Sequence, residues 1–279
     1  MNSNNFVLVD VSALAHRALH STPDLRHPDN PEMPTGILYQ IGKTVEQLQH
    51  IYSTWNVAFF FDSRQSRRKE LCPEYKATRE ALRAAEPADM QQKRKDMYEQ
   101  VNALPKLLKD MGCANIFGQT GYEADDLIAS AIRNNPAKDF IVASRDQDLY
   151  QLLSPSVKLF DPQTKAEYTE SDFWKEWEIQ PTQWSSVKAW AGCASDNVIG
   201  LKGVGEKTAV KFLRGKLSQE SAKYSLFSDN LAVYTKNIEL VRLPLKGAMD
   251  VKLVVQDTPM KWGVLADYIG AVTFGWEMG

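Results

Sequence analysis

Short apolar runs that end in an acidic residue recur along the first 160 positions. "FVLVD" (6–10) and "VAFFFD" (57–62) each end in an aspartate, and "FIVASRDQD" (140–148) changes from apolar to acidic in the same way. "NIFGQ" (115–119) and "VKLF" (157–160) are further short runs. Continuous apolar runs of this length are typical of strands that are buried on both faces of a parallel sheet.

Helical periodicity fills the gaps between these runs, over about 12–20, 36–52, 90–111 and 123–134. Alternating strands and helices predict an α/β fold with a mainly parallel sheet flanked by helices. Beyond about residue 180 the pattern becomes helical, as in "TQWSSVKAWAGC", "KTAVKFL" and "YTKNIELVRL". We therefore expect an α/β domain over 1–180 and a helical domain over 181–279. "HPDNPEMP" (27–34) is interpreted as a proline-rich loop.

Carboxylates gather where the expected strands end. Asp10, Asp62 and Asp146 each follow a strand, and "GYEADDLIAS" (121–130) places three more carboxylates directly after another. Ligands bind at this edge of open α/β sheets. Like charges about 4 Å apart repel by roughly 1 kcal/mol in water and about 4 kcal/mol at an effective dielectric of 20, so solvent or a cation must neutralise the cluster. The candidates are Asp10, Asp62, Glu123, Asp125, Asp126, Asp146, Asp148 and Asp196.

A donor set made of oxygen alone suits hard cations such as Mg²⁺ or Mn²⁺ rather than zinc. Two such ions about 3.5–4 Å apart can clamp the attacking and leaving oxygens of a phosphodiester. Any single aspartate has an alternative role as a helix cap or turn residue. The placement of the whole set at strand ends favours a site for two ions.

"GLKGVGEKTA" (200–209) superficially resembles a phosphate-binding loop. A P-loop requires G-x-x-x-x-G-K-[ST] after a strand, whereas here Glu206 separates Gly205 from Lys207 and the preceding segment is not expected to be a strand. A helix–hairpin–helix over about 187–213 is the better interpretation. In it, Gly203 and Gly205 form a tight turn whose backbone N–H groups bind a phosphate at a helix N-terminus. A plain interhelical loop is the alternative.

Charge is distributed unevenly although the net charge is only −2. Residues 64–95 hold ten Lys/Arg and five Asp/Glu, a local charge of +5. This segment follows the strand that ends at Asp62, so its cations should lie over the acidic edge and neutralise an approaching phosphate. Lys76 and Arg79 are one helical turn apart, and Tyr75 is a candidate to stack on a base. The alternative is an ordinary solvated helix.

Other classes of protein are disfavoured. No apolar run approaches the 18 residues of a membrane span, and the N-terminus lacks the pattern of a secretory signal. The three cysteines, Cys72, Cys113 and Cys193, are few and far apart, which indicates free thiols in a reducing compartment. A cytoplasmic protein is expected.

The combined motifs resemble the 5′ nuclease, or flap endonuclease, family, which includes the 5′ nuclease part of bacterial family-A DNA polymerases and stand-alone phage 5′–3′ exonucleases. The matching stretches run in family order from residue 6 to about 213: "VDVSALAHRALH", "FFFDS", "EYKATR", "GYEADDLIA", "SRDQDLYQLL" and "SDNVIGLKGVGEKTA". A polymerase region is not present, so the chain resembles a stand-alone, phage-type enzyme of DNA replication or repair. The implied core is of the PIN-like type.

The resemblance implies a role for each matching position. Asp10, Asp62, Glu123, Asp125 and Asp126 would hold a first metal, Asp148 and Asp196 a second, and Asp146 lies between the two groups. Lys76 and Arg79 would contact the scissile phosphate from a helical arch over about 64–100. Arg17 and Arg68 match basic positions near the active site. Gly203, Gly205 and Lys207 would hold duplex DNA at the hairpin, with K⁺ as a candidate ion there.

Two positions depart from the family pattern. The family commonly reads "GDxSDN" where this chain reads "GCASDN", so Cys193 replaces a second-group aspartate. A thiol is a poor Mg²⁺ ligand, so the second site is expected to be weaker, unless Cys193 is a packing residue that never faces it. His16 stands where the family often has tyrosine.

The resemblance implies a metal-dependent nuclease with two Mg²⁺ or Mn²⁺ ions. It would act as a monomer on DNA with 5′ flaps, ends or branches, including RNA primers, and leave 5′-phosphate products. Two alternatives stay open: a catalytically weakened, structure-specific DNA-binding protein, which Cys193 favours, and a PIN-type RNase. The glycine hairpin and the long basic segment argue against the RNase.

Overall fold

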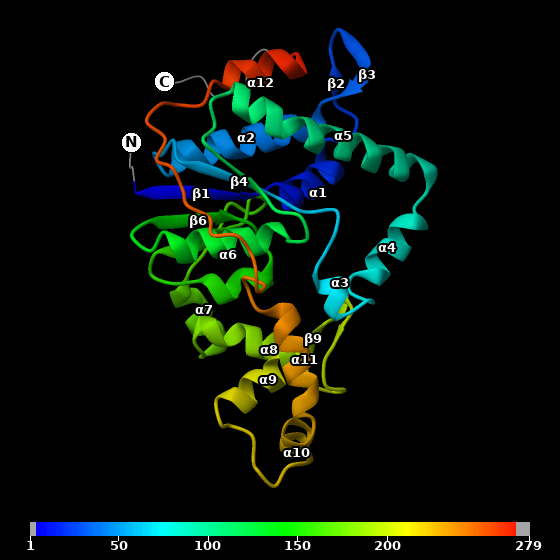
Figure 1. The fold of residues 1–279 in the computed structure, drawn as a ribbon, viewed down its shortest axis with the longest axis vertical. Helices are drawn as coiled ribbons and strands as arrows, with labels where there is room; N and C mark the ends of the chain where they lie inside the picture. The colour runs from blue at the N-terminus through cyan, green and yellow to red at the C-terminus, as the bar shows by residue number, and fades with distance from the viewer. Residues whose placement is uncertain (1–3, 272–279) are drawn as a thin grey trace.

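A six-stranded sheet forms the centre of the computed structural model, which describes residues 4–271 (Figure 1). The strand order is β5–β4–β1–β6–β7–β8, and only the edge strand β8 runs antiparallel to its neighbour. The strands span Asn5–Asp10 (β1), Val57–Phe61 (β4), Asn115–Gly118 (β5), Asp139–Ala143 (β6), Val157–Phe160 (β7) and Glu167–Tyr168 (β8). The expected mainly parallel α/β sheet is confirmed.

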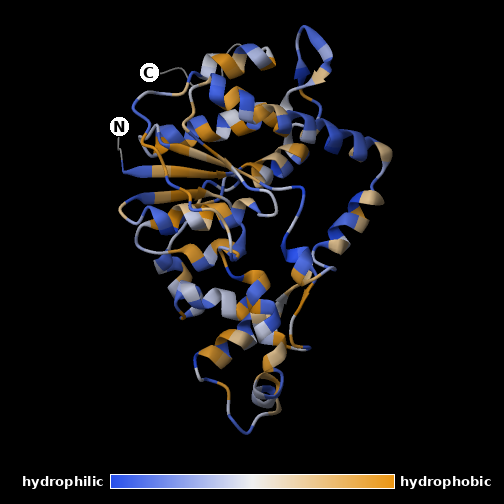
Figure 2. Ribbon diagram, in the orientation of Figure 1, coloured by the Kyte–Doolittle hydropathy of each residue, from blue (hydrophilic) through white to orange (hydrophobic). Residues whose placement is uncertain are grey.

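Strand β1 shows why the apolar runs of the sequence become central strands. Its side chains alternate between two hydrophobic cores, with Val7 and Val9 in one and Phe6 and Leu8 in the other. All four are fully buried. Figure 2 shows the same contrast along the chain, with mostly hydrophobic strands surrounded by helices that mix hydrophobic and hydrophilic residues. The sheet is therefore covered on both faces, as continuous apolar runs require.

One face of the sheet is covered by the helices drawn above it in Figure 1. These helices are α1 (Val11–Ser21), α2 (Gly36–Ile51), α5 (Ala88–Asp110) and α12 (Trp262–Ile269). The other face packs against helices α6 (Ala124–Asn134), α7 (Glu170–Trp177) and α8 (Trp184–Ala191). Helix α12 packs on α2 and α5, so the chain returns to the α/β core after the helical region.

A helical region lies beyond α8 at the lower end of the molecule (Figure 1). It contains α9 (Glu206–Leu213), α10 (Ala222–Asp229) and α11 (Leu231–Val241). A small hairpin of β9 (Gly192–Cys193) and β10 (Val198–Ile199) joins α8 to this region, with the 3₁₀ turn η3 (Ala194–Asp196) at its tip. Trp190 of α8 packs against Phe212 and Phe227, which builds this region onto the same core as the lower face of the sheet. Two further 3₁₀ turns are η1 (Gln147–Leu152) and η2 (Pro181–Gln183).

The basic segment stands away from the sheet on the right of Figure 1. This segment, called the arch below, consists of α3 (Arg68–Leu71), α4 (Ala77–Ala84) and the first turns of α5. Helix α4 has no buried residue, and its Leu82 side chain is exposed. Hydrophobic packing therefore does not hold this helix in place, and polar contacts must do so.

The expected proline-rich loop is instead an exposed antiparallel hairpin, β2 (Arg26–His27) and β3 (Asn30–Pro34). Prolines are tolerated there because an edge strand leaves one row of N–H positions unpaired. No helix within residues 4–271 is long and apolar enough to cross a membrane.

Candidate active site

The carboxylates converge because the chain switches direction at the central strand. From β1 the chain builds β4 and β5 on one side and then β6 and β7 on the other. Asp10 ends β1, Asp62 follows β4, and Asp146 lies just after β6. These three residues share the carboxyl edge of the sheet at its switch point, which is where ligands bind in this architecture.

Each of these aspartates also organises local backbone. The Asp10 carboxylate caps α1 by accepting a hydrogen bond from the Ala13 N–H at 2.9 Å. The Asp62 carboxylate accepts from the Ala124 N–H, in the first turn of α6, at 2.7 Å. Asp146 accepts from the Asp148 N–H at 2.8 Å. These aspartates therefore do bind backbone N–H groups at helix starts, as the alternative interpretation expected, and they also converge on one edge of the sheet.

The first carboxylate group comprises Asp10, Asp62, Glu123, Asp125 and Asp146. Crowding of negative charge raises the pKa of two of its members, Asp10 and Asp125. Burial, together with the nearby charges of Asp62 and Asp146, raises the pKa of Asp10 to about 7. Burial and the charges of Asp10, Asp146 and Asp62 raise the pKa of Asp125 well above its usual value. The buried Oδ1 atom of Asp125 has no hydrogen-bond partner. A buried, unpartnered carboxylate oxygen among other carboxylates fits a hard divalent cation.

Asp126 lies beside this group but faces another way. It is fully buried, and its two oxygens accept from the Arg68 guanidinium at 2.7 and 2.8 Å. The same oxygens accept from the backbone N–H groups of Leu245 and Glu123. Four protein donors leave this carboxylate no free lone pair for an ion, so its geometry is that of a structural ion pair. Arg68, which is 2% exposed, is likewise enclosed rather than presented to a phosphate.

The residues of the "EYKATR" motif lie across the acidic edge. The Lys76 ammonium is 2.8 Å from Glu123 Oε1, and the Arg79 guanidinium is 2.6 Å from Asp196 Oδ1. Burial opposes the charge of Lys76, but Glu123 and Asp196 together raise its pKa. Tyr75 is 3% exposed, and its hydroxyl donates toward Glu123 and Asp196 at 3.2 and 3.3 Å. Tyr75 therefore offers no face for base stacking, contrary to the expectation from the sequence.

Polar contacts also hold α4 to the turn η3. The Lys76 N–H donates to the Asp196 carbonyl, and Arg79 Nε donates to the Ser195 carbonyl at 2.8 Å. Asn197 exchanges two hydrogen bonds with Thr78. The arch is thus tied to the second carboxylate group by the segment that carries Asp196.

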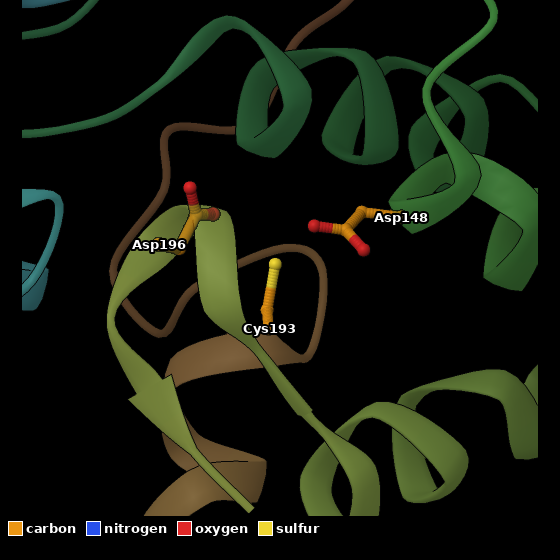
Figure 3. A group of neighbouring side chains, drawn as sticks. All are labelled: Asp148, Cys193 and Asp196. Carbon is orange, nitrogen blue, oxygen red and sulfur yellow. The ribbon is translucent and has the colours of Figure 1, made fainter. Parts of the chain in front are cut away.

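The second group comprises Asp148, Cys193 and Asp196, whose ligand atoms all lie within 4.8 Å of one another (Figure 3). No other set of three His, Cys, Asp or Glu donors meets this distance within residues 4–271. Figure 3 shows the thiol pointing between the two carboxylates. Cys193 is half-buried, with its Sγ 3.2 Å from Ser195 Oγ. Its thiol therefore faces the site, and the side chain also packs against the small apolar cluster of Cys72, Tyr75, Val198 and Leu240.

Close backbone contacts fix the hairpin that carries Cys193. Gly192 has φ +79°, and a Cβ atom there would come within 2.5 Å of the Gly200 nitrogen and the Val198 carbonyl. A Cβ atom at Gly200 would come 2.2 Å from the Ala191 carbonyl carbon. Glycine is required where two backbones approach this closely.

The glycine turn before α9 is exposed. Gly203 has φ +78°, Gly205 is the N-cap of α9, and a Cβ atom at either position would meet no atom within 4 Å. Lys207, in the first turn of α9, is exposed as well. This turn lies beyond the second group along the chain, and its open surroundings are compatible with contact to a phosphate backbone.

Lys188, a charged residue near the candidate site, was missed from the sequence. The Lys188 ammonium lies 3.1 Å from Asp148 and 3.0 Å from Glu206. His16 lies within 3.3 Å of Arg83 and 3.5 Å of Arg94. Burial and the two arginines lower the pKa of His16 to about 4, so its ring is neutral near pH 7. A lone lysine on the apolar helix "WSSVKAWA" was the available signal for Lys188.

A cavity of about 40 Å³ connects these parts. Asp10 and Asp62 of the first carboxylate group do not line it. Its polar lining comes from the arch and from other members of both carboxylate groups: Arg68, Tyr75, Lys76, Arg79, Glu123, Asp125, Asp146, Asp148 and Asp196. Arg17, on α1 after Asp10, is partly exposed and does not line it. The arrangement offers oxygen donors for cations on one side and Lys76 and Arg79 for a phosphate on the other.

Comparison with known proteins identifies the family. Residues 5–178 match the family model for the 5′–3′ exonuclease, N-terminal resolvase-like domain. The 5′–3′ exonuclease of Bacillus subtilis is 32% identical over 228 residues, which cover 77% of this chain and 71% of that protein. The thermostable DNA polymerase I of Thermus aquaticus is 30% identical over 91% of this chain and 29% of its own length. This chain belongs to the 5′–3′ exonuclease family.

Solved structures show the same fold. The zinc-bound bacteriophage T5 5′-exonuclease superposes with a TM-score of 0.75 at 23% identity, covering 95% of this chain and 97% of that one. The catalytic core of Rad2 in complex with DNA superposes with a TM-score of 0.58 at 14% identity, covering 97% and 88%.

Proposed function

We propose that this protein is a divalent-metal-dependent, structure-specific 5′ nuclease that hydrolyses DNA phosphodiester bonds near 5′ flaps, ends or branches and leaves 5′-phosphate products. The observation that carries the proposal is the convergence of carboxylates from separate segments of the chain. Asp125, Asp146 and Asp196 line one cavity together with Lys76 and Arg79, and the charges of Asp10 and Asp62 lie close enough to Asp125 to raise its pKa. Family membership agrees with it, and so does the bacteriophage T5 flap endonuclease, whose structure was determined with DNA and metal ions.

The first carboxylate group would hold Mg²⁺ through Asp10, Asp62, Asp125 and Asp146, with Glu123 at its margin. When bound there, divalent ions supply Lewis-acid stabilisation of the charge that develops at the phosphodiester. Two observations support this assignment: Asp125 has an unpartnered buried oxygen, and the pKa of Asp10 is raised. A divalent cation bound here would neutralise the repulsion between these carboxylates. Asp126 would not bind the ion itself but would stabilise the site through its ion pair with Arg68.

Lys76 and Arg79 would neutralise and orient the scissile phosphate. Both now pair with carboxylates, so a phosphate that enters can exchange one anionic partner for another without moving the arch far. Preorganised cations of this kind act mainly on the transition state.

The glycine turn over 203–205 and Lys207 would hold the downstream duplex as part of a helix–hairpin–helix, with K⁺ as a candidate ion. Arg17 would contribute to the basic surface beside the arch, and a monomer would suffice for this chemistry. RNA primers annealed to DNA are further candidate substrates.

A catalytically weakened DNA-binding protein is the second candidate, and one observation favours it. Lys188 and Arg79 already balance much of the charge of the second group, which also has a thiol in place of a carboxylate. The first group argues against it, because its carboxylates are all in place.

Incubation with 5′-flap DNA and with single-stranded RNA, each with Mg²⁺ and with chelator, separates the candidates. Flap cleavage that depends on Mg²⁺ supports the nuclease. Flap binding without cleavage supports the weakened protein, and preferential cleavage of RNA contradicts both.

A further inference from the structure

The donor chemistry of the second group differs from that of the first. The first group offers carboxylate oxygens, whereas Asp148, Cys193 and Asp196 combine two carboxylates with a thiol that points between them (Figure 3). Magnesium prefers oxygen and near-ideal octahedral geometry, so a sulfur donor does not fit it. Zinc accepts both Cys sulfur and Asp oxygen, and three protein ligands with one open position are typical of its catalytic sites.

The local charges point the same way. Lys188 lies 3.1 Å from Asp148, and Arg79 lies 2.6 Å from Asp196, so both carboxylates already have a cationic partner. An ion that binds here must compete with these two side chains. A hard, strongly hydrated ion gains little from a neutral thiol in that competition, whereas a thiophilic ion gains a metal–sulfur bond and converts the thiol to thiolate.

We propose that Asp148, Cys193 and Asp196 form a mixed oxygen–sulfur site that selects a thiophilic divalent ion, such as Zn²⁺ or Co²⁺, over Mg²⁺. As the metal–sulfur bond forms, the S–H bond of Cys193 breaks and its proton passes to the solvent. The two carboxylate groups of this protein therefore differ in metal preference. The inference rests on the proposed function, in which the acidic edge holds divalent ions, and the experiment below keeps the two separable.

Cobalt is the probe, because thiolate coordination to Co²⁺ gives a ligand-to-metal charge-transfer band in the near ultraviolet. DNA-free protein is titrated with Co²⁺ while a large excess of Mg²⁺ fills the oxygen sites. We expect a band that saturates near one equivalent and disappears in Cys193→Ser, with Co²⁺ affinity reduced about 10–100-fold or more. The absence of a band in the natural protein, or an unchanged band in Cys193→Ser, would overturn the inference.

Two further variants control the measurement. Cys72→Ser removes the other thiol on this side of the molecule, where Cys72 is 5% exposed with its Sγ 3.6 Å from Glu74 Oε2, so a serine hydroxyl can replace the interaction. Its band should persist, and loss of the band in a folded Cys72→Ser protein would assign the site to the wrong cysteine. Cys193→Asp should lose the band and gain Mg²⁺ affinity, measured by calorimetry. Unchanged Mg²⁺ affinity in this variant would contradict the proposed selectivity.

Flap cleavage with Mg²⁺, assayed in parallel on the natural protein, separates the two ideas. Cleavage without the cobalt band overturns this inference and leaves the proposed function intact. The band without cleavage supports the mixed site and contradicts the nuclease.

Discussion

Arg68 and Asp126 form a bidentate ion pair, with N–O distances of 2.7 and 2.8 Å, in which both side chains are almost completely buried. The pair joins α3, at the base of the arch, to α6, which begins beside the first carboxylate group. Arg68 also donates to the Leu240 carbonyl in α11, so one side chain connects three parts of the molecule.

Removal of Arg68 should therefore destabilise the fold more than it weakens DNA binding. We expect Arg68→Ala to lower the free energy of unfolding by about 3–5 kcal/mol, because Asp126 is left as a buried, uncompensated charge. Arg67→Ala is the matched control, because the Arg67 side chain is half exposed and pairs with Glu70 at the surface, so its removal should cost much less stability. Denaturant melts of both variants test this. Equal stability of the two variants would show that the buried pair is not structural.

Stability of the metal-free protein should fall as pH rises. The pKa of Asp10 is raised to about 7 by burial and by Asp62 and Asp146, from an ordinary value of 3.8. Between these values the folded state binds more protons than the unfolded state, so the stability that this group contributes is fully present below pH 3.8 and is lost as the pH rises to about 7. We expect chelator-treated protein to lose about 1–4 kcal/mol between pH 5 and pH 8 through this group.

Two comparisons isolate this effect. Asp10→Asn keeps an N-cap for α1 but removes the titrating group, so it should flatten the pH slope. Mg²⁺ should restore stability at pH 8 and have little effect at pH 5. A slope that neither Asp10→Asn nor Mg²⁺ changes would mean that the carboxylate crowding does not limit stability.

Lys76 should matter for turnover more than for affinity. If it stabilises charge on the scissile phosphate, Lys76→Ala should lower kcat by about 10²–10³ while KM changes little. Lys69→Ala is the control, because Lys69 lies in the same basic segment but pairs with Glu80 at the surface, 2.5 Å away. Single-turnover cleavage and anisotropy binding separate the two effects. An effect on binding alone would reduce Lys76 to one part of a salt-sensitive surface.

The glycine turn gives a test of duplex binding that need not disturb the fold. Gly205 has an ordinary φ of −99° and open space around its Cβ position, so Gly205→Asn adds bulk and still provides an N-cap for α9. We expect melting to be unchanged, duplex affinity to fall about tenfold, and affinity for a short single strand to be retained. Normal duplex binding by this variant would remove the turn from the DNA interface.

The sequence predicted the sheet well because its strands are buried on both faces and so read as uninterrupted apolar runs. The sequence could not show that Asp125 and Asp126 have different roles. Neighbouring residues in the first turn of a helix point in different directions, and only the packed position of Arg68 shows that Asp126 is the enclosed one. Tyr75 was misjudged for a related reason, since its hydroxyl is bound by carboxylates from segments far along the chain. Lys188 was missed because Asp148 and Glu206, which surround it, are distant in sequence.

The most direct test of the proposed function is a cleavage assay on 5′-flap DNA that compares the natural protein with Asp146→Ala. The natural protein should cut near the flap junction with Mg²⁺, leave a 5′-phosphate and become inactive with chelator. Asp146→Ala should still bind the flap, because removal of a negative charge favours an approaching phosphate, but should lose cleavage. Near-normal cleavage by Asp146→Ala, or cleavage by the natural protein that persists with chelator, would contradict metal-dependent catalysis at this sheet edge.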